Sequence, residues 1–369
     1  MYGQKMNSRQ LKNILAHIFR CNDGLYSSGK RGTPVMIWGH HGLGKTQLVT
    51  DFTRENGWKL AYCAPAQFEE MGDLHGIPTE ITSANSSGDK YMIYSPPEWV
   101  PKTEGPGILL LDDINRADER ILRGIMQLLQ NFELMSWMLP PKWQIVCTGN
   151  PDTSDYSVTP MDDAMLTRLL HTTMVFDVRA WAEWATAAGI DKRCISFVLT
   201  YPESITGKRT TPRSLVQFFD QIAGISDFKS EIELITALAM SSLDDNTVAT
   251  FTCFVNDDLQ QLIDPEEILQ TTKISTIAKR ISELIFSSNG VKRLDRIATI
   301  CSRLYLHLVS NKYKPGKNDA ENLQEFFLIK EIPSDLKMSL YIDLQREARQ
   351  EVRDMLDDKR LATLLVKAL

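Results

Sequence analysis

The stretch MIWGHHGLGKTQLV, residues 36–49, sets three glycines, a lysine and a threonine between an apolar run and the start of a helical pattern. Gly39, Gly44, Lys45 and Thr46 fit the pattern GxxxxGK[ST]. Glycines let a backbone wrap closely around phosphate, and the loop N–H groups together with the helix N-terminus favour negative charge. A lysine at this position reaches the terminal phosphates, and the hydroxyl beside it is a ligand for Mg²⁺. The stretch therefore predicts a nucleotide-phosphate loop.

The predicted nucleotide-binding residues are those of the loop and of the first helical turn. They are Gly39, His40, His41, Gly42, Leu43, Gly44, Lys45, Thr46 and Gln47. The two histidines fill the variable positions of the pattern, so we interpret them as exposed loop residues rather than metal ligands. A glycine-rich turn that merely caps a helix is the alternative, and the apolar run VMIW before the loop argues against it.

An acidic pair follows another apolar run in GILLLDDINRADER, residues 107–120. A carboxylate at the end of a buried strand beside a phosphate loop can hold Mg²⁺ through water, and the next carboxylate can orient or deprotonate an attacking water. We therefore assign Asp112, with Thr46, to the metal site and Asp113 to activation of the water. Strands often end in acidic turn residues, so the acidic pair indicates a metal site only in combination with the phosphate loop.

The composition indicates a globular protein of two or three domains. Of its 369 residues, 43% are hydrophobic and 24% are charged. No apolar run approaches the roughly 20 residues of a membrane span, and the first residues lack the apolar core of a signal peptide. We therefore expect a cytoplasmic protein. The six cysteines form no CxxC pair, which argues against a zinc site or a disulfide frame, and the net charge of −6 argues against nucleic acid as the main partner.

Short apolar runs recur along the first half of the chain. Separated by helical patterns, they are typical of parallel strands covered on both faces; they are VMIW, WKLAYCA, GILLLDD, WQIVCTGN and HTTMVFDV. The spacing of apolar residues from Leu11 to Phe19 predicts an amphipathic helix before them. Beyond about residue 180 helical patterns dominate. There, the apolar positions from Leu336 to Leu356 predict one long helix.

Six motifs, taken in order, resemble those of the MoxR family of AAA+ ATPases, in the helix-2 insert clade. They are GHHGLGKT at 39–46, GDLHGIP at 72–78, LLLDDINRA at 109–117, CTGNPDT at 147–153, MLTRLLH at 165–171 and TTPRSL at 210–215. The resemblance covers about residues 10–260. It implies an α/β fold, a P-loop AAA+ three-layer α/β/α domain with a five-stranded parallel sheet, followed by an α-helical lid. It also implies ring oligomers, commonly hexamers, with ATP and Mg²⁺ at the subunit interfaces.

On this basis we divide the chain into three parts. Residues 1–180 form the nucleotide-binding domain, with an insert at about 69–104. Residues 181–262 form the α-helical lid. Residues 263–369, which the resemblance does not cover, form a helical C-terminal extension that serves as a lid extension, an oligomerisation element or a partner-docking arm.

Three further catalytic residues take their roles from the resemblance. Asn150 matches the sensor-1 residue that helps to place the attacking water, and Arg168 matches the arginine finger that reaches the nucleotide of a neighbouring subunit. Arg213 matches sensor 2 on the lid, and Thr211 and Pro212 are suited to start the helix that carries it. Each has a plainer alternative: a turn at Asn150-Pro151, a surface arginine at 168, and an ion pair at 213. Arg116 and Arg123 are secondary interface candidates.

Two features depart from, or extend, the family pattern. The second acidic position is usually Glu, whereas this chain has Asp113, one methylene shorter, which predicts slow hydrolysis or dependence on ring geometry. The insert resembles the segment that clade members project toward the ring pore. Its residues Tyr91 to Tyr94 either contact a substrate or form one strand of a small hairpin, and NFELMSWMLPPKW, residues 131–143, suggests a second hairpin.

The leading prediction is a Mg²⁺-dependent ATPase that remodels or activates a protein partner. By resemblance, the candidate adaptor is a protein with a von Willebrand factor A domain. One alternative is a nucleotide-dependent component acting on DNA, like the restriction subunits and helicases of the same clade. Another is a nucleotide-gated assembly module with little turnover, which the replacement of Glu by Asp113 keeps open.

Overall fold

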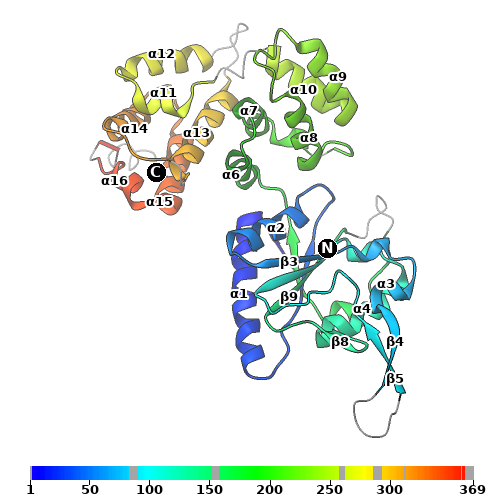
Figure 1. Ribbon diagram of the computed structural model, residues 1–369. Coiled ribbons are helices and arrows are strands. Elements are labelled where there is room, and N and C mark those ends of the chain that lie inside the picture. The colour runs from blue at the N-terminus through cyan, green and yellow to red at the C-terminus, as the bar shows by residue number, and fades with distance from the viewer. Residues whose placement is uncertain are drawn as a thin grey trace. The chain divides into compact units, whose positions relative to one another are not determined.

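The computed structural model describes residues 2–82, 90–151, 158–205, 207–256, 262–285, 293–310, 313–358 and 360–361. The chain divides into two compact units, Met1–Asp177 and Val178–Leu369 (Figure 1). The first unit contains a sheet with helices packed on it. The elements that we describe in the second unit are helices.

The sheet of the first unit has six strands. Each neighbouring pair runs parallel, so the carboxyl ends of all these strands lie at one edge of the sheet. In spatial order the strands are β1 (Gln4–Met6), β10 (Leu170–Met174), β2 (Val35–Trp38), β9 (Trp143–Gly149), β6 (Gly107–Leu111) and β3 (Lys59–Cys63). The five predicted apolar runs therefore all form strands, and the prediction of a parallel sheet is confirmed.

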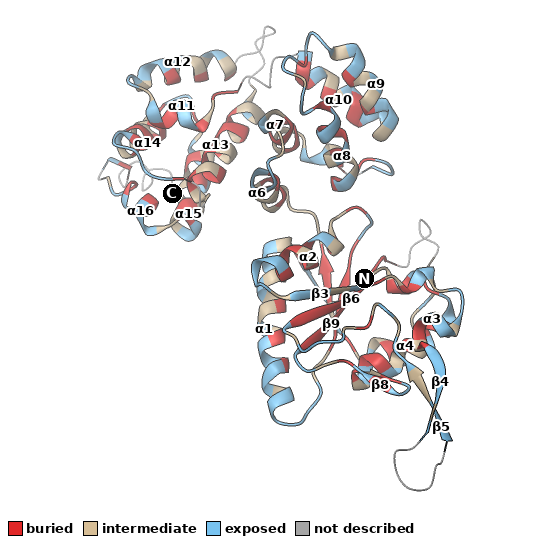
Figure 2. Cartoon of the chain, in the orientation of Figure 1, coloured by how far each residue is buried: buried red, intermediate tan, exposed pale blue. Residues whose placement is uncertain are grey.

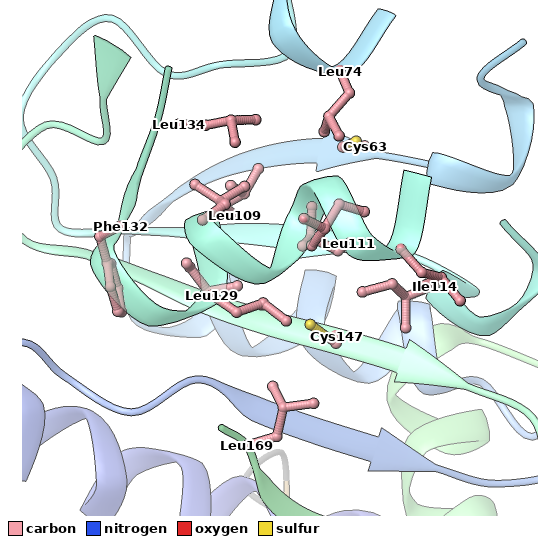
Figure 3. Close-up of a cluster of buried hydrophobic side chains, with 14 of the residues drawn as sticks. Cys63, Leu74, Leu109, Leu111, Ile114, Leu129, Phe132, Leu134, Cys147 and Leu169 are labelled. Atoms are coloured by element: carbon pink, nitrogen blue, oxygen red, sulfur yellow. The ribbon is translucent and has the colours of Figure 1, made fainter. Parts of the chain in front are cut away.

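Both faces of the sheet are buried, because alternate residues of its central strands point into two different cores. Ile37 and Leu110 pack with α1 (Ser8–Ser27) and α2 (Lys45–Glu55) on one face. On the other face, Leu109 and Leu111 pack with α4 (Glu119–Asn131), as Figure 3 shows for these leucines and Leu129. The three-layer α/β/α prediction is thus confirmed.

The sheet has six strands rather than the five that we predicted. The additional strand is β1, whose residues Gln4 to Met6 pair with Thr172 to Met174. Three residues are too few to show the period of a strand. Gly3 admits the chain to this position: its φ is 79°, and a Cβ there would lie 2.1 Å from His171 O. Glycine adopts this conformation without a side-chain clash.

The insert forms a hairpin that projects from the first unit (Figure 1). After α3 (Met71–His75), β4 (Ile77–Thr82) pairs antiparallel with β5 (Lys90–Ser95), which confirms the hairpin interpretation of Tyr91 to Tyr94. Most of its residues are exposed (Figure 2). Residues 83–89 of the insert lie outside the described residues. The second predicted hairpin is also present, as β7 (Glu133–Leu134) and β8 (Trp137–Met138).

The second unit begins directly after β10. Its helices are α6 (Val178–Ala188), α7 (Lys192–Thr200), α8 (Pro212–Ile222), α9 (Ile232–Ser242), α10 (Asp245–Asn256), α11 (Pro265–Gln270), α12 (Ile274–Ile285), α13 (Leu294–Val309), α14 (Asp319–Leu328), α15 (Ser334–Glu347) and α16 (Gln350–Asp354). Among the described helices of the chain, none combines the length and apolarity required to cross a membrane. The division of this unit into a lid and an extension stays a prediction.

The prediction of one long helix near the C-terminus is wrong. Two helices, α15 and α16, are separated at Ala348, whose ψ of 156° is extended rather than helical. The carbonyl of Ala348 accepts a hydrogen bond of 2.8 Å from Arg353 Nε, so a side chain satisfies a backbone group at the break. Leu344, Ala348 and Val352 are nevertheless all buried. The apolar spacing therefore predicts correctly which residues are buried, but it wrongly predicts an unbroken helix.

Candidate functional site

The glycine-rich loop joins β2 to α2 at the carboxyl edge of the sheet. Gly42 and Gly44 have φ angles of 72° and 88°, a region that side chains disfavour. Gly39 has no such φ, but a Cβ there would lie 3.0 Å from Met174 O and 3.3 Å from Leu43 Cδ1. The glycines thus produce a tight turn that leads into the N-terminus of α2. Within the loop His40 and His41 are exposed, as predicted.

Lys45 lies at the first position of α2, yet only 6% of it is exposed. Its Nζ donates to Gly39 O at 2.8 Å and to His40 O at 3.2 Å, both within the loop. It also donates to Asn150 Oδ1 at 3.0 Å. The ammonium is therefore folded back over the loop and held beside the residue that follows β9.

Three hydroxyl groups surround the carboxylate of Asp112. Thr46 Oγ1 and Thr148 Oγ1 donate to Asp112 Oδ1 at 2.8 and 2.6 Å. Tyr62 Oη donates to Asp112 Oδ2 at 3.1 Å. The residues predicted for the metal site, Thr46 and Asp112, are thus in direct contact although 66 positions separate them in the sequence.

Asp113 and Asn150 are joined at the same edge. Asn150 Nδ2 donates to Asp113 Oδ1 at 3.0 Å, and Asn150 itself is 1% exposed. Asn115, in the short 3₁₀ helix η2 (Ile114–Arg116), fixes the backbone of Asn150 through bonds of 2.8 and 3.1 Å. Arg116 Nε lies 3.6 Å from Asp113 Oδ2. A continuous set of contacts therefore runs from Lys45 through Asn150 to Asp113.

Sequence reasoning missed Tyr62, Thr148 and Asn115. Thr148 occupies the position of β9 paired with Ile37, just before the phosphate loop, and it also accepts a 2.8 Å bond from Asp113 N. Asn115 lies in the LLLDDINRA motif and Thr148 in CTGN, so both were available as polar residues at strand ends. Tyr62 had no comparable signal, because its strand pattern shows only an ordinary aromatic residue in WKLAYCA.

The structure places Arg168 away from these residues. Leu170 of β10 pairs with Val35, the first residue of β2, so Arg168 precedes the amino end of the sheet, whereas the loop follows its carboxyl end. The intervening strand of four residues spans about 13 Å. Arg168 Nε donates to Gln130 Oε1 at 3.0 Å, and its Nη1 contacts the carbonyl of Ala164.

Arg213 lies in the second unit, near the start of α8. Thr211 is the N-cap of this helix and Pro212 follows it, so the predicted helix start is confirmed. Thr211 and Ser214 form a capping box, in which Thr211 Oγ1 accepts from Ser214 N at 3.2 Å. The sensor-2 role of Arg213 stays a prediction.

The residues at the carboxyl edge suit a phosphate group with a magnesium ion. The positive φ angles of Gly42 and Gly44 let the loop turn tightly, and both the buried ammonium of Lys45 and the N-terminus of α2 favour an anion. Thr46 and Asp112 supply a hydroxyl and a carboxylate, which are oxygen ligands of the kind that Mg²⁺ prefers. The donor set therefore fits the predicted ligands.

Comparisons with known proteins give low similarity. No protein-family model and no curated protein sequence matches the chain. Among solved structures, the RuvB Holliday junction branch migration motor of Thermotoga maritima is 14% identical with a TM-score of 0.38, over 77% of this chain and 85% of RuvB. NtrX of Brucella abortus is 13% identical with a TM-score of 0.33, over 58% of this chain and 52% of NtrX.

Proposed function

We propose that this protein is a Mg²⁺-dependent ATPase of the AAA+ class, of MoxR type, acting in the cytoplasm. The observation that carries the proposal is the single set of contacts at the carboxyl edge of the sheet. Lys45, Asp113 and Asn150 are linked by hydrogen bonds of 3.0 Å, and Thr46 contacts Asp112 beside them. A glycine-rich turn that only caps a helix does not account for a buried lysine and two carboxylates gathered at its mouth.

In this proposal each side chain has a separate task. The loop N–H groups and Lys45 bind the phosphates of ATP, while Thr46 and Asp112 hold the metal. Bound Mg²⁺ would reduce the charge repulsion between phosphate oxygens and the attacking group. Asp113 orients and deprotonates the attacking water, and Asn150 holds Asp113 in position through its amide. Asn115 keeps Asn150 at this edge.

The second part of the proposal is a ring, with hexamers as the expected form. Arg168 lies at the other edge of the sheet, so in this proposal it acts on ATP bound to a neighbouring subunit and stabilises charge in the transition state. ATP hydrolysis would then drive remodelling or activation of a protein partner. A protein with a von Willebrand factor A domain is the proposed adaptor, and Arg213 the proposed sensor 2.

The test of nucleotide binding compares the wild-type protein with Lys45→Ala. The substitution removes the buried ammonium that we propose binds the ATP phosphates, so it should weaken ATP binding on the order of 10²-fold. The matched control is Lys59→Ala, which removes a lysine that contacts Thr103 and Glu104 at the amino end of β3. Titration with a fluorescent ATP analogue gives both dissociation constants. Wild-type affinity in Lys45→Ala would refute the assignment of the loop.

Assembly and turnover are measured on the wild-type protein by mass photometry and phosphate release in the same samples, with and without ATP and Mg²⁺. Ring-sized particles that release phosphate support the proposed motor. Particles that bind ATP without releasing phosphate would support the assembly module instead, an alternative that the short side chain of Asp113 keeps open.

A further inference from the structure

Tyr62, on the edge strand β3, places its hydroxyl group beside the carboxylate of Asp112, the proposed metal ligand. It lies on β3, where it pairs with Leu110, two residues before Asp112. The backbone of the two strands is tied at this end by the bond from Asp112 N to Cys63 O, of 2.8 Å. This strand pairing holds Tyr62 next to Asp112. Tyr62 Oη lies 3.1 Å from Asp112 Oδ2.

The two oxygens of Asp112 have different partners. Oδ1 accepts from Thr46 and Thr148, whereas Oδ2 accepts from Tyr62. Thr46 is also the proposed ligand of Mg²⁺, so the metal would take this hydroxyl away from Asp112. Thr148 and Tyr62 would then hold the carboxylate, one at each oxygen, and prevent it from rotating about its terminal bond.

The tyrosine acts as a hydrogen-bond donor in this contact. The ordinary pKa of a tyrosine phenol, about 10, lies well above neutral pH. The phenol therefore keeps its proton at neutral pH, and a protonated phenol facing an ionised carboxylate donates to it. Bonds to a charged acceptor are stronger than neutral ones.

Packing alone is a poor explanation for this residue. Tyr62 is 50% exposed, and its neighbour on the same face of β3, Leu60, is 38% exposed. On the opposite face of the strand, Cys63 is buried in the core. The exposed face of β3 therefore buries little apolar surface at Tyr62, and the contact with Asp112 is what distinguishes this side chain.

We propose that Tyr62 is a positioning residue for the metal site, which holds the carboxylate of Asp112 in the orientation that binds Mg²⁺. The inference rests on the proposed function and adds a residue outside the motifs that predicted it. Tyr62 acts through Asp112 and does not itself contact the phosphates. Loss of the Tyr62 hydroxyl should therefore weaken the binding of the metal ion. The affinity for nucleotide in the absence of metal should be unchanged.

The variant that tests this is Tyr62→Phe, which removes the hydroxyl and keeps the half-exposed ring. Its control is Tyr26→Phe, the same change at a tyrosine of α1 that is 47% exposed. The probes are a non-hydrolysable ATP analogue in EDTA and Mn²⁺, whose binding to the analogue-loaded protein is followed by electron paramagnetic resonance. We expect Tyr62→Phe to need about threefold to tenfold more Mn²⁺ for half-saturation, with unchanged analogue affinity in EDTA. Turnover should return toward the wild-type value at saturating Mg²⁺.

The remaining outcomes separate this inference from the proposed function. Equal Mn²⁺ affinity in Tyr62→Phe and the wild type would overturn the role of Tyr62 and leave the ATPase proposal intact. Loss of analogue affinity in EDTA would also overturn it, because the tyrosine would then support the whole site rather than the metal. A wild-type protein that binds no nucleotide would remove both proposals.

Discussion

The two edges of the sheet in the first unit differ in how their polar residues are held. At the carboxyl edge, Lys45 and Asn150 are 6% and 1% exposed, they contact each other, and Asn150 also donates to Asp113. At the amino edge, Arg168 is partly exposed and contacts Gln130 and the Ala164 carbonyl. In our proposal, the carboxyl edge binds nucleotide within a single chain. The other presents a cation for which, in our proposal, a second chain supplies the target.

This difference indicates which kinds of functional residue can be recognised in the structure of a single subunit. Buried polar groups must find partners within the fold, so a binding site of that kind is visible in the subunit alone. An arginine that acts across an interface has no such requirement before assembly. We therefore expect changes at the carboxyl edge to act within the altered subunit, and changes at Arg168 to act on its neighbour.

The largest effect should come from Arg168→Ala. If the guanidinium stabilises the transition state, turnover should fall on the order of 10³-fold, with ATP binding retained. The control is Arg120→Ala, which removes an arginine of α4 that is paired with Asp118 and 76% exposed in its side chain. Phosphate release and ATP titration measure the two quantities.

A mixture of two inactive variants tells which subunit Arg168 serves. Arg168→Ala subunits keep their loop, and Lys45→Ala subunits keep their arginine, so mixed rings should recover part of the turnover. A mixture that assembles but stays inactive would contradict the action of Arg168 across a subunit interface. The proposed difference between the two edges of the sheet would then no longer hold.

Asp113→Asn should reduce turnover by roughly 10²-fold or more, because an amide cannot accept the proton of the attacking water. ATP binding should persist, since Lys45 and the loop are unchanged. Asp118→Asn, an exposed change at the start of α4, is the control. The measurement is single-turnover phosphate release with bound ATP quantified separately. Undiminished release would assign the base to another residue at this edge.

The smallest effect is expected in the second unit, where Thr211 caps α8. Thr211→Ala removes the acceptor for Ser214 N and should lower the free energy of unfolding by about 1 kcal/mol. Thr211→Ser keeps the hydroxyl and should stay close to the wild type. Denaturant unfolding of both variants checks this. Equal midpoints for alanine and serine would show that the cap adds nothing to stability.

The sequence predicted the features that depend on adjacent residues. The loop, the acidic pair and the five longer strands all carry their signal within a few positions, and a buried parallel strand is marked by its own apolar run. Tyr62 and Thr148 meet Asp112 across 50 and 36 positions. No local pattern encodes such contacts, because the order of strands in the sheet creates them. Strand β1 was missed because of its length, and the break at Ala348 because apolar spacing continues through it.

The backbone at Asp113 bears on attempts to raise the turnover that we propose for this protein. Its φ of 47° and ψ of 43° place it in the left-handed region, where Asp and Asn are more readily accommodated than longer side chains. Replacing it by Glu, the residue usual in the MoxR family, would add reach toward a water and also add conformational strain. Introducing glutamate at this position is therefore not expected to be a simple gain of function. An engineer seeking faster turnover would have to relax the turn after β6 first, and change the carboxylate second.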